Sequence, residues 1–354
     1  MTYRKILFKF LLTAFLFCSS TLVKAQHESG KDEKFNPGTF ILDHIGDAYE
    51  WHILSWNGKH VSVPLPVILY SKQSGFNIFM SSKFHHGSHN GFSISADGPS
   101  KGKIVEQTAD YLLVRPMLDL SITKNVFALF VSMTIILWVF LSVAKTYKLR
   151  NNLPPKGLQS LVEPVLLFVR DDIARPAIGH KYERFMPYLL TIFFFILVNN
   201  LMGLIPFFPF GANVTGNIAV TMVLALLTFF ITTFSANKKY WVHIVNTPGV
   251  PWWLKFPLPL MPFIELVGML TKPVVLMIRL FANITAGHII AIGFFSLIFI
   301  FGALNPTMGY GASVISIIFT VFMTLLELLV AFIQAYVFTL LSALYFGMAV
   351  EEHH

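Results

Sequence analysis

The architecture of the chain is best understood from one stretch, Lys272-Pro-Val-Val-Leu-Met-Ile-Arg279-Leu-Phe-Ala-Asn283-Ile-Thr-Ala-Gly-His288. It lies in a segment from about 256 to 301 that is too apolar for a soluble helix, yet this segment carries Glu265, Lys272, Arg279 and His288. A charge at bilayer depth costs at least roughly 2.5–3.5 kcal/mol, so such residues face a bundle interior or a wet cavity. Glu265, Lys272 and Arg279 follow one another at two-turn spacing and Asn283 comes one turn later, so all four share one helical face. The pattern predicts a membrane helix with one polar face around an arginine that stays protonated.

Composition indicates an integral membrane protein. Hydrophobic residues make up 55% of the 354 residues and charged residues only 12%, with a mean hydropathy of +0.65. Soluble domains carry about 25% charged residues. The formal charge of +8 is spread over short loops between apolar segments, which is typical of membrane topology rather than of a nucleic-acid surface. We therefore expect a lipid bilayer as surroundings and no nucleic acid as partner.

The N-terminus has the pattern of a secretory signal peptide. Basic residues precede a short apolar core from Phe10 to Phe17, and small and polar residues follow up to Ala25. We predict a signal peptide over 1–25 with cleavage after Ala25. An uncleaved signal anchor is the alternative, but the apolar run is short for a span. The single cysteine, Cys18, excludes an internal disulfide.

Export of this terminus makes 26–123 a small extracytoplasmic region. Turn signals such as Asn57-Gly58 separate short alternating runs, including His60-Val-Ser-Val and Phe76-Asn-Ile-Phe, which favour a few strands. Five histidines lie here, at positions 52, 60, 85, 86 and 89. A metal site is the alternative here, but without cysteine or a firm ligand spacing we favour a plain extracytoplasmic cap and predict no metal.

The rest of the chain, 124–354, reads as an all-α multi-pass membrane domain of about five to six helices. We expect spans at about 126–146, 187–207, 217–236, 256–301 and 311–350. Lysines directly after the first span put that end of the span in the cytoplasm. We expect the protein in the cell inner (plasma) membrane, with its C-terminus also on the cytoplasmic side. The mixed stretch from Gln159 to Arg184 is expected to be a helix at the inner surface.

The last two apolar segments exceed what a perpendicular helix needs. Either the first bends into a hairpin within itself, or both are long, strongly tilted helices. Asn305-Pro306 and the glycines at 309 and 311 turn the chain between them, so that the two segments form a hairpin.

The final segment carries a second polar face. At steps of three and four it presents Ser313, Ser316, Thr320, Thr324, Glu327, Ala331 and Gln334. Hydroxyls in such a row often bond only to backbone carbonyls of their own helix. Glu327 changes this interpretation, because an unpaired carboxylate in lipid is costly. His288 on the preceding helix is its candidate partner in taking up and releasing protons; a packed, neutral imidazole is the alternative.

These residues resemble subunit a of the membrane sector of the rotary (F-type) ATP synthase. The resemblance rests on Lys272-Pro, on Arg279-Leu-Phe-Ala-Asn283, on Ala286-Gly-His288 and on Glu327 with Gln334. Weaker similarity covers Asn200-Leu-Met-Gly-Leu-Ile-Pro and Asn213-Val-Thr, so that about 120–354 is accounted for.

The resemblance implies a proton-channel stator. Arg279 would be the stator arginine facing the rotor ring, with Asn283 and Gln334 beside it. Many bacterial members have Glu and His where this chain has His288 and Glu327, an exchange shared with mitochondrial relatives. Many members have Asp where this chain has Gly203, so the inlet half-channel is expected to be lined differently. The implied partners are the c-ring, the subunit b peripheral stalk and the rest of the complex.

In this interpretation the proton-translocating residues are Arg279, Asn283, His288, Glu327 and Gln334. A supporting polar face is formed by Glu265, Lys272, Ser316, Thr320 and Thr324. No cofactor, metal or catalytic residue is expected, and the chain has no Walker A loop. An independent secondary transporter is the main alternative, but no internal repeat is visible. A zinc or serine hydrolase lacks its His-Glu-x-x-His or Gly-x-Ser-x-Gly motif.

Overall fold

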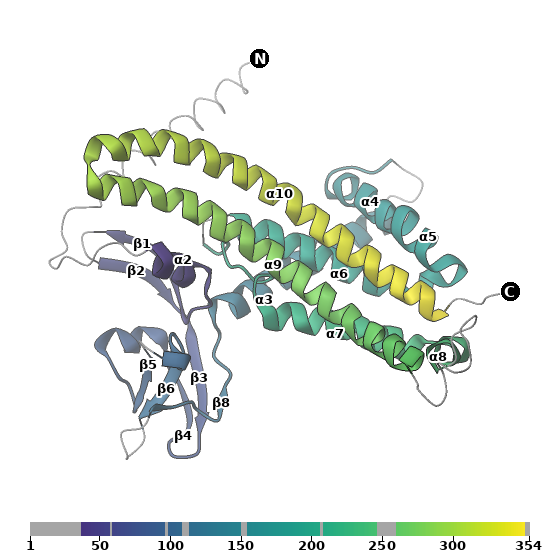
Figure 1. The fold of residues 1–354 in the computed structure, drawn as a ribbon, viewed down its shortest axis with the longest axis horizontal. Helices are drawn as coiled ribbons and strands as arrows, with labels where there is room; N and C mark the ends of the chain where they lie inside the picture. Colours follow the sequence, from purple (N-terminus) through teal and green to yellow (C-terminus); the bar gives the residue numbers. More distant parts are fainter. Residues whose placement is uncertain are drawn as a thin grey trace. The chain divides into compact units, whose positions relative to one another are not determined.

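The computed structural model describes residues 37–56, 59–95, 98–107, 113–149, 154–205, 208–245 and 260–350. The chain divides into two compact units, one with 48–124 and one with 37–47 and 125–350 among the described residues (Figure 1). The structure is mostly helical and its strands lie in the N-terminal region, which confirms the predicted fold class. The predicted signal peptide, 1–25, lies outside the described residues. Pro37–Asp47, which we predicted as part of the exported region, groups with the helical unit.

The strand-bearing unit contains three small antiparallel sheets, with orders β1-β2, β4-β3-β8 and β5-β6-β7. The strands are β1 (Glu50–Trp56), β2 (Lys59–Pro64), β3 (Pro66–Ser71), β4 (Gly75–Met80), β5 (Phe92–Ile94), β6 (Ile104–Gln107), β7 (Leu113–Val114) and β8 (Leu118–Asp119). The two runs predicted as strands are found in β2 and β4. A core of Val67, Leu69, Phe92 and Ile104 holds the unit together.

The helical unit is built from helices of very unequal length. They are α2 (Pro37–Ile45), α3 (Lys124–Leu149), α4 (Leu158–Phe168), α5 (Arg175–Ile178), α6 (Tyr182–Leu204), α7 (Ile218–Ser235), α8 (Lys238–Val245), α9 (Leu260–Leu304) and α10 (Pro306–Val350). In the described residues, five helical segments are long and apolar enough to cross a membrane: 124–149, 158–204, 218–235, 260–304 and 306–350. The predicted spans correspond to α3, α6, α7, α9 and α10.

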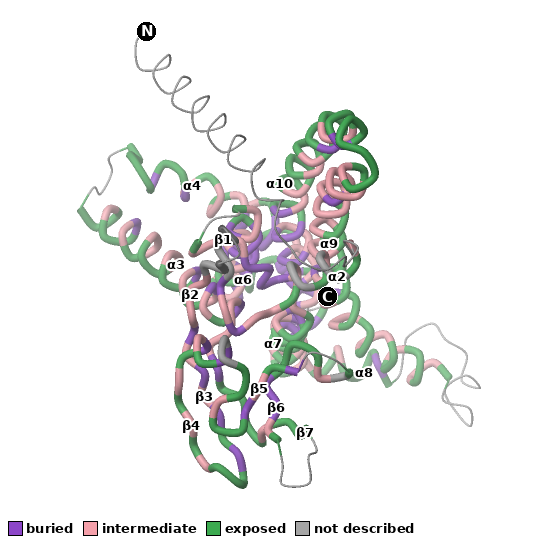
Figure 2. Tube along the Cα trace, turned by 90° about the vertical axis from the view of Figure 1, so that its left-hand side faces the viewer, coloured by how far each residue is buried: buried purple, intermediate pink, exposed green. Residues whose placement is uncertain are grey.

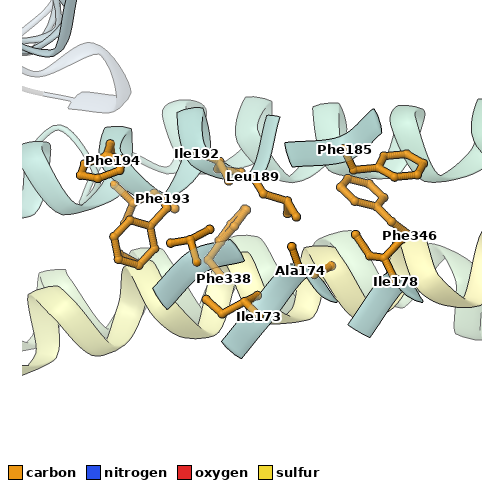
Figure 3. Packing of buried hydrophobic residues seen from close by; sticks show 14 of the residues in the cluster. Ile173, Ala174, Ile178, Phe185, Leu189, Ile192, Phe193, Phe194, Phe338 and Phe346 are labelled. Carbon is orange, nitrogen blue, oxygen red and sulfur yellow. The ribbon is translucent and has the colours of Figure 1, made fainter. Parts of the chain in front are cut away.

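The core of this unit lies where α6 packs on the C-terminal part of α10 (Figure 3). Phe185 of α6 stacks on Phe346 of α10 with ring centroids 4.8 Å apart. Gly347 of α10 allows a close approach to the short helix α5 (Arg175–Ile178), because a Cβ at position 347 would clash with the carbonyl oxygen of Ala177. A small residue at a helix contact thus lets two backbones meet, as is common in membrane bundles.

The segment before α6 differs from the single surface helix that we predicted. It consists of α4, a π-helical turn (Val169–Ala174) and the short α5. The π-turn presents Val169, Ile173 and Ala174 to the core, and all three are fully buried. The mixed composition reflects one face packed against the bundle and one exposed face that carries the charged residues.

The two C-terminal helices, α9 and α10, form a long antiparallel hairpin (Figure 1). Each has 45 residues, hence a length of roughly 68 Å at 1.5 Å per residue, against about 30 Å of hydrocarbon. Since α9 is continuous through Pro273, the alternative in which this segment bends back on itself is wrong.

Only Asn305 separates the two helices. Its side-chain oxygen accepts a hydrogen bond from the backbone N–H of Thr307 at 3.0 Å, which caps α10. Gly302 and Gly309 bring the two backbones together beside the turn, where a Cβ on Gly309 would lie 2.7 Å from the Cα of Gly302. Figure 2 shows that this end of the hairpin is largely exposed.

Candidate functional site

The centre of the candidate site is the contact between His288 of α9 and Glu327 of α10. Their Nδ1 and Oε1 atoms lie 3.4 Å apart, and the side chains are 18% and 12% exposed. Glu327 Oε1 is buried and accepts no hydrogen bond from the described residues. The structure thus brings together the imidazole and the carboxylate that the sequence placed on facing helices. A small rotation of either side chain would allow a proton to pass between them.

Gly287 makes this contact possible. A Cβ at position 287 would lie 2.6 Å from Glu327 Oε1 and 3.2 Å from its carboxyl carbon. The carboxylate therefore occupies the space beside α9 that only a glycine leaves open. From the sequence, Gly287 is noticed only as part of the Ala286-Gly-His288 resemblance. The reason for a glycine in a helix can be found only when the residue that faces it is known.

Both side chains line a pocket of about 160 Å³ between α6, α9 and α10. Its polar residues are Asn200, Asn283, His288 and Glu327, and the rest of the wall is apolar apart from the backbone. A titratable pair in a mostly apolar, concave space is the arrangement expected of a functional site. Gly203 lies at the edge of this region, and a Cβ there would be 3.9 Å from His288 Nε2.

Asn200 anchors α6 to the pocket. Its Nδ2 donates to the carbonyl oxygen of Ala331 at 3.2 Å, and its Oδ1 accepts from the Thr215 hydroxyl at 2.6 Å. The Asn200 residue is almost completely buried. An asparagine in the middle of an apolar span is the signal from which sequence analysis could have predicted this role.

Arg279 and Asn283 lie on the exposed side of α9, one turn apart. Leu276 and Leu280, on the adjoining flank of the helix, are buried. Arg279 forms no ion pair or hydrogen bond with the part of the chain that the structure describes. Its guanidinium lies close enough to Tyr345 for an electrostatic interaction.

Gln334 is buried on α10. Two contacts between α9 and α10 define their antiparallel register: His288 with Glu327, and Lys272 with Tyr345. This register places Gln334 level with the turn from Arg279 to Asn283.

The other two members of the predicted stripe lie elsewhere. Lys272 Nζ is 5.3 Å from the ring centroid of Tyr345, a cation–π contact. Lys272 also lines a narrow crevice of about 10 Å³, together with threonines of α7 and Tyr240 of α8. Burial, with a smaller contribution from the nearby Glu265 carboxylate, raises the pKa of the Tyr240 phenol from its ordinary value of 10.0. The single polar face is thus divided between two environments.

The hydroxyl row of α10 is divided as well. Thr324 donates to the carbonyl oxygen of Thr320 at 2.9 Å, which is the local role that hydroxyls in helices often have. Ser316 is buried, and the Thr320 hydroxyl is buried without a partner among the described residues. Only Glu327 of this stripe meets a titratable side chain of α9 in the described structure.

The described residues contain no cluster of three or more His, Cys, Asp or Glu side chains that could hold a metal ion. His89 packs edge-on against the ring of Phe79 at 4.9 Å. The side chains of the other four histidines of this region, at positions 52, 60, 85 and 86, lie outside the described residues.

Comparison with known proteins covers both units. Residues 126–347 match the family described as ATP synthase A chain, and residues 40–117 match a family described only as a domain of unknown function. ATP synthase subunit a of Chloroherpeton thalassium is 45% identical over 244 residues, which cover 66% of this chain and 69% of the relative. ATP synthase subunit a 2 of Chlorobaculum tepidum is 48% identical over 241 residues, covering 66% and 64%.

A more distant relative extends over the strand-bearing unit. ATP synthase subunit a of an Anaeromyxobacter species is 34% identical over 352 residues, which cover 93% of this chain and 75% of that protein. The N-terminal region therefore has a counterpart in another chain of the same kind.

Proposed function

The chain belongs to the ATP synthase A chain family, and from that premise we propose that its pocket and its arginine form the stationary side of a proton path. Members of this family are non-catalytic membrane subunits, so the chain is a multi-pass membrane protein within the ATP synthase complex. Its general role is that of the proton-channel stator. The observation that carries the detailed proposal is the His288–Glu327 contact in a pocket beside the exposed face of α9.

In the proposed inlet half-channel, the pocket admits protons from outside the cytoplasm. His288 and Glu327 hold them in turn, since an imidazole and a carboxylate within reach of each other exchange a proton over a short path. Asn283 lines the same pocket and extends the polar wall toward Arg279. From there the proton reaches a carboxylate on the c-ring, which is neutralised and can rotate through lipid.

Arg279 acts in this mechanism by its charge and not as a proton carrier, because a guanidinium does not release its proton in proteins. When a protonated ring carboxylate arrives at the second half-channel, the guanidinium favours its ionised form and so its deprotonation. The fixed positive charge also separates the two half-channels. Its exposure on α9, without an ion pair or hydrogen bond to the described residues, supports this assignment. Gln334, level with this turn, would orient groups beside it.

The remaining assignments complete the proposal. The c-ring contacts the Arg279 face, and subunit b of the peripheral stalk contacts another part of the membrane domain, 124–354. Residues 1–25 are a signal peptide, and 26–123 lie outside the cytoplasm of a cell inner membrane, with the C-terminus inside. Glu265, Lys272, Ser316, Thr320 and Thr324 support the polar faces. An independent transporter is disfavoured, since the named relatives of this chain are subunits of ATP synthase.

The test is ATP-driven acidification of membrane vesicles that carry Arg279→Ala. Ile278→Ala is a matched control, because Ile278 is next to Arg279 and its side chain is also exposed on α9 but carries no charge. We expect Arg279→Ala to abolish acidification while the complex still assembles, and Ile278→Ala to retain it. Normal pumping by assembled Arg279→Ala complexes would show that the central assignment is wrong.

A further inference from the structure

The β4-β3-β8 sheet of the N-terminal unit has apolar side chains on both faces. Along β3, Val67 and Leu69 point inward and are fully buried. The alternate positions of β4 carry Phe76, Ile78 and Met80, and these are 62%, 63% and 43% exposed. Exposed and partly buried positions alternate along this strand (Figure 2). A sheet with one solvated face normally has polar side chains on that face, so this face is unusual.

The exposed apolar positions are continuous across all three strands. Tyr70 of β3 pairs with Phe76 on one side and with Leu118 on the other. The backbone N–H of Leu120 donates to the carbonyl oxygen of Ile68, which extends the ladder beyond β8. We call the exposed members the outer sheet face: Tyr70, Phe76, Ile78, Met80, Leu118 and Leu120. Contiguous apolar surface of this kind marks an interaction site.

The sheet is tied closely to the start of a membrane helix. The backbone N–H of Ile122 donates to the carbonyl oxygen of Pro66, and that of Lys124 to the carbonyl oxygen of Ala48. Lys124 is the first residue of α3, and Val126 begins its apolar run. Val126 comes four residues after Ile122, and at roughly 3.4 Å per extended residue this stretch spans at most about 14 Å. The end of the sheet at Pro66 therefore cannot lie far from the membrane boundary.

The charges of the unit fit a negatively charged surface. Its described acidic residues are hydrogen-bonded internally: Glu50 with Ser62, Glu106 with Ser71, and Asp119 with Tyr49. Two lysines with exposed side chains flank this sheet, Lys72 directly after β3 and Lys83 shortly after β4. Basic residues beside a membrane attract anionic headgroups, and an amphipathic ring such as that of Tyr70 favours the headgroup level.

We propose that the outer sheet face docks on the lipid surface of the leaflet that α3 enters at its N-terminal end. Phe76, Ile78 and Met80 enter the boundary between headgroups and acyl chains, and the basic residues around the face bind lipid phosphates. Apolar groups buried to this depth, together with attraction to anionic lipid, are what hold interfacial segments on membranes. The N-terminal unit is then a membrane-bound cap. This inference does not depend on the roles proposed for Arg279 or Glu327.

The experiment measures the depth of one side chain in the full-length protein, assembled in its complex and reconstituted in vesicles of phosphatidylethanolamine and phosphatidylglycerol. Cys18→Ser removes the only native cysteine. Ile78→Cys then carries an environment-sensitive fluorophore, and Lys103→Cys, an exposed position next to β6 in another sheet, is the matched control. Both variants must retain ATP-driven pumping, which shows that they are folded and assembled.

We expect doxyl-labelled lipid to quench the label at 78 several-fold more strongly than the label at 103, and aqueous iodide to do the reverse. Equal iodide quenching at both positions would overturn the proposal, because the outer sheet face would then be solvated. Protection of position 78 from both quenchers would also overturn it, since a protein surface would then be the occupant.

Discussion

The backbone of Gly287 lies so close to the carboxylate of Glu327 that a Cβ at 287 would be 2.6 Å from Oε1. The next residue, His288, reaches the same oxygen with its Nδ1 at 3.4 Å. One turn of α9 thus provides both the free space and the titratable partner for a carboxylate of α10. The first two predictions below concern this contact, and the next two concern contacts between helices and loops elsewhere in the bundle.

Gly287→Ala should displace the Glu327 carboxylate from His288. A misplacement of about 1 Å can cost up to 10²-fold in a reaction that depends on geometry, and we expect about a ten-fold loss of ATP-driven proton pumping. Vesicle acidification measures it, with assembly checked by immunoblotting. Gly293→Ala is the control, because nothing lies within 4 Å of a Cβ at that position. Equal pumping by both variants would contradict the inferred contact.

Exchanging the pair should preserve more function than removing either member. His288→Ala and Glu327→Ala each leave one titratable group without its partner, and we expect losses of about 10²-fold, the low end for a positioned proton-transfer group. The double variant His288→Glu with Glu327→His keeps one imidazole and one carboxylate within reach. Its pumping should exceed that of both single variants. A double variant as inactive as the singles would argue against direct proton exchange between the two positions.

Gly347→Ala should destabilise the fold without touching the proposed proton path. The added methyl group would collide with the carbonyl oxygen of Ala177, a backbone atom that cannot turn aside. Overpacking of this kind costs about 1–3 kcal/mol, which should appear as a lower midpoint of thermal unfolding in detergent. Gly311→Ala, at a position with open space, serves as the comparison. An unchanged midpoint for Gly347→Ala would mean that α10 and α5 are not in such close contact.

The amide of Asn200 should couple energetically to Thr215. Asn200→Leu keeps most of the volume but leaves the Thr215 hydroxyl and the Ala331 carbonyl without their partner. A buried polar group without a partner costs about 1–3 kcal/mol. Thr215→Val alone should also destabilise, and the double variant should lose less than the sum of the two. Strict additivity in this double-mutant cycle would show that the hydrogen bond contributes nothing to stability.

Much of the helical architecture was predictable, because length and hydropathy alone define a span in lipid. The predicted hairpin of α9 and α10 follows from two apolar segments on either side of Asn305-Pro306. The division of 158–181 into α4, a π-turn and α5 was not predictable. Its boundaries depend on tertiary contacts such as that of Ala177 with Gly347, and a periodic pattern does not reveal these.

The site was predictable to the level of helical faces but not of contacts. Spacing placed Glu265, Lys272 and Arg279 on one face, whereas the structure puts Lys272 against Tyr345 and leaves Arg279 exposed. A face of a helix as long as α9 passes several neighbours, so residues that share it need not share an environment. The role of Arg279 in proton translocation stays a prediction, which Arg279→Ala tests.

The single-residue turn at Asn305 also has a consequence for how the chain can change in length. With no loop to absorb an insertion, one residue added between His288 and the turn would rotate everything before it by about 100° relative to α10. His288 would then leave the side of α9 that faces Glu327. The number of residues between position 288 and position 327 is therefore constrained by the turn as well as by the side chains that meet across the hairpin.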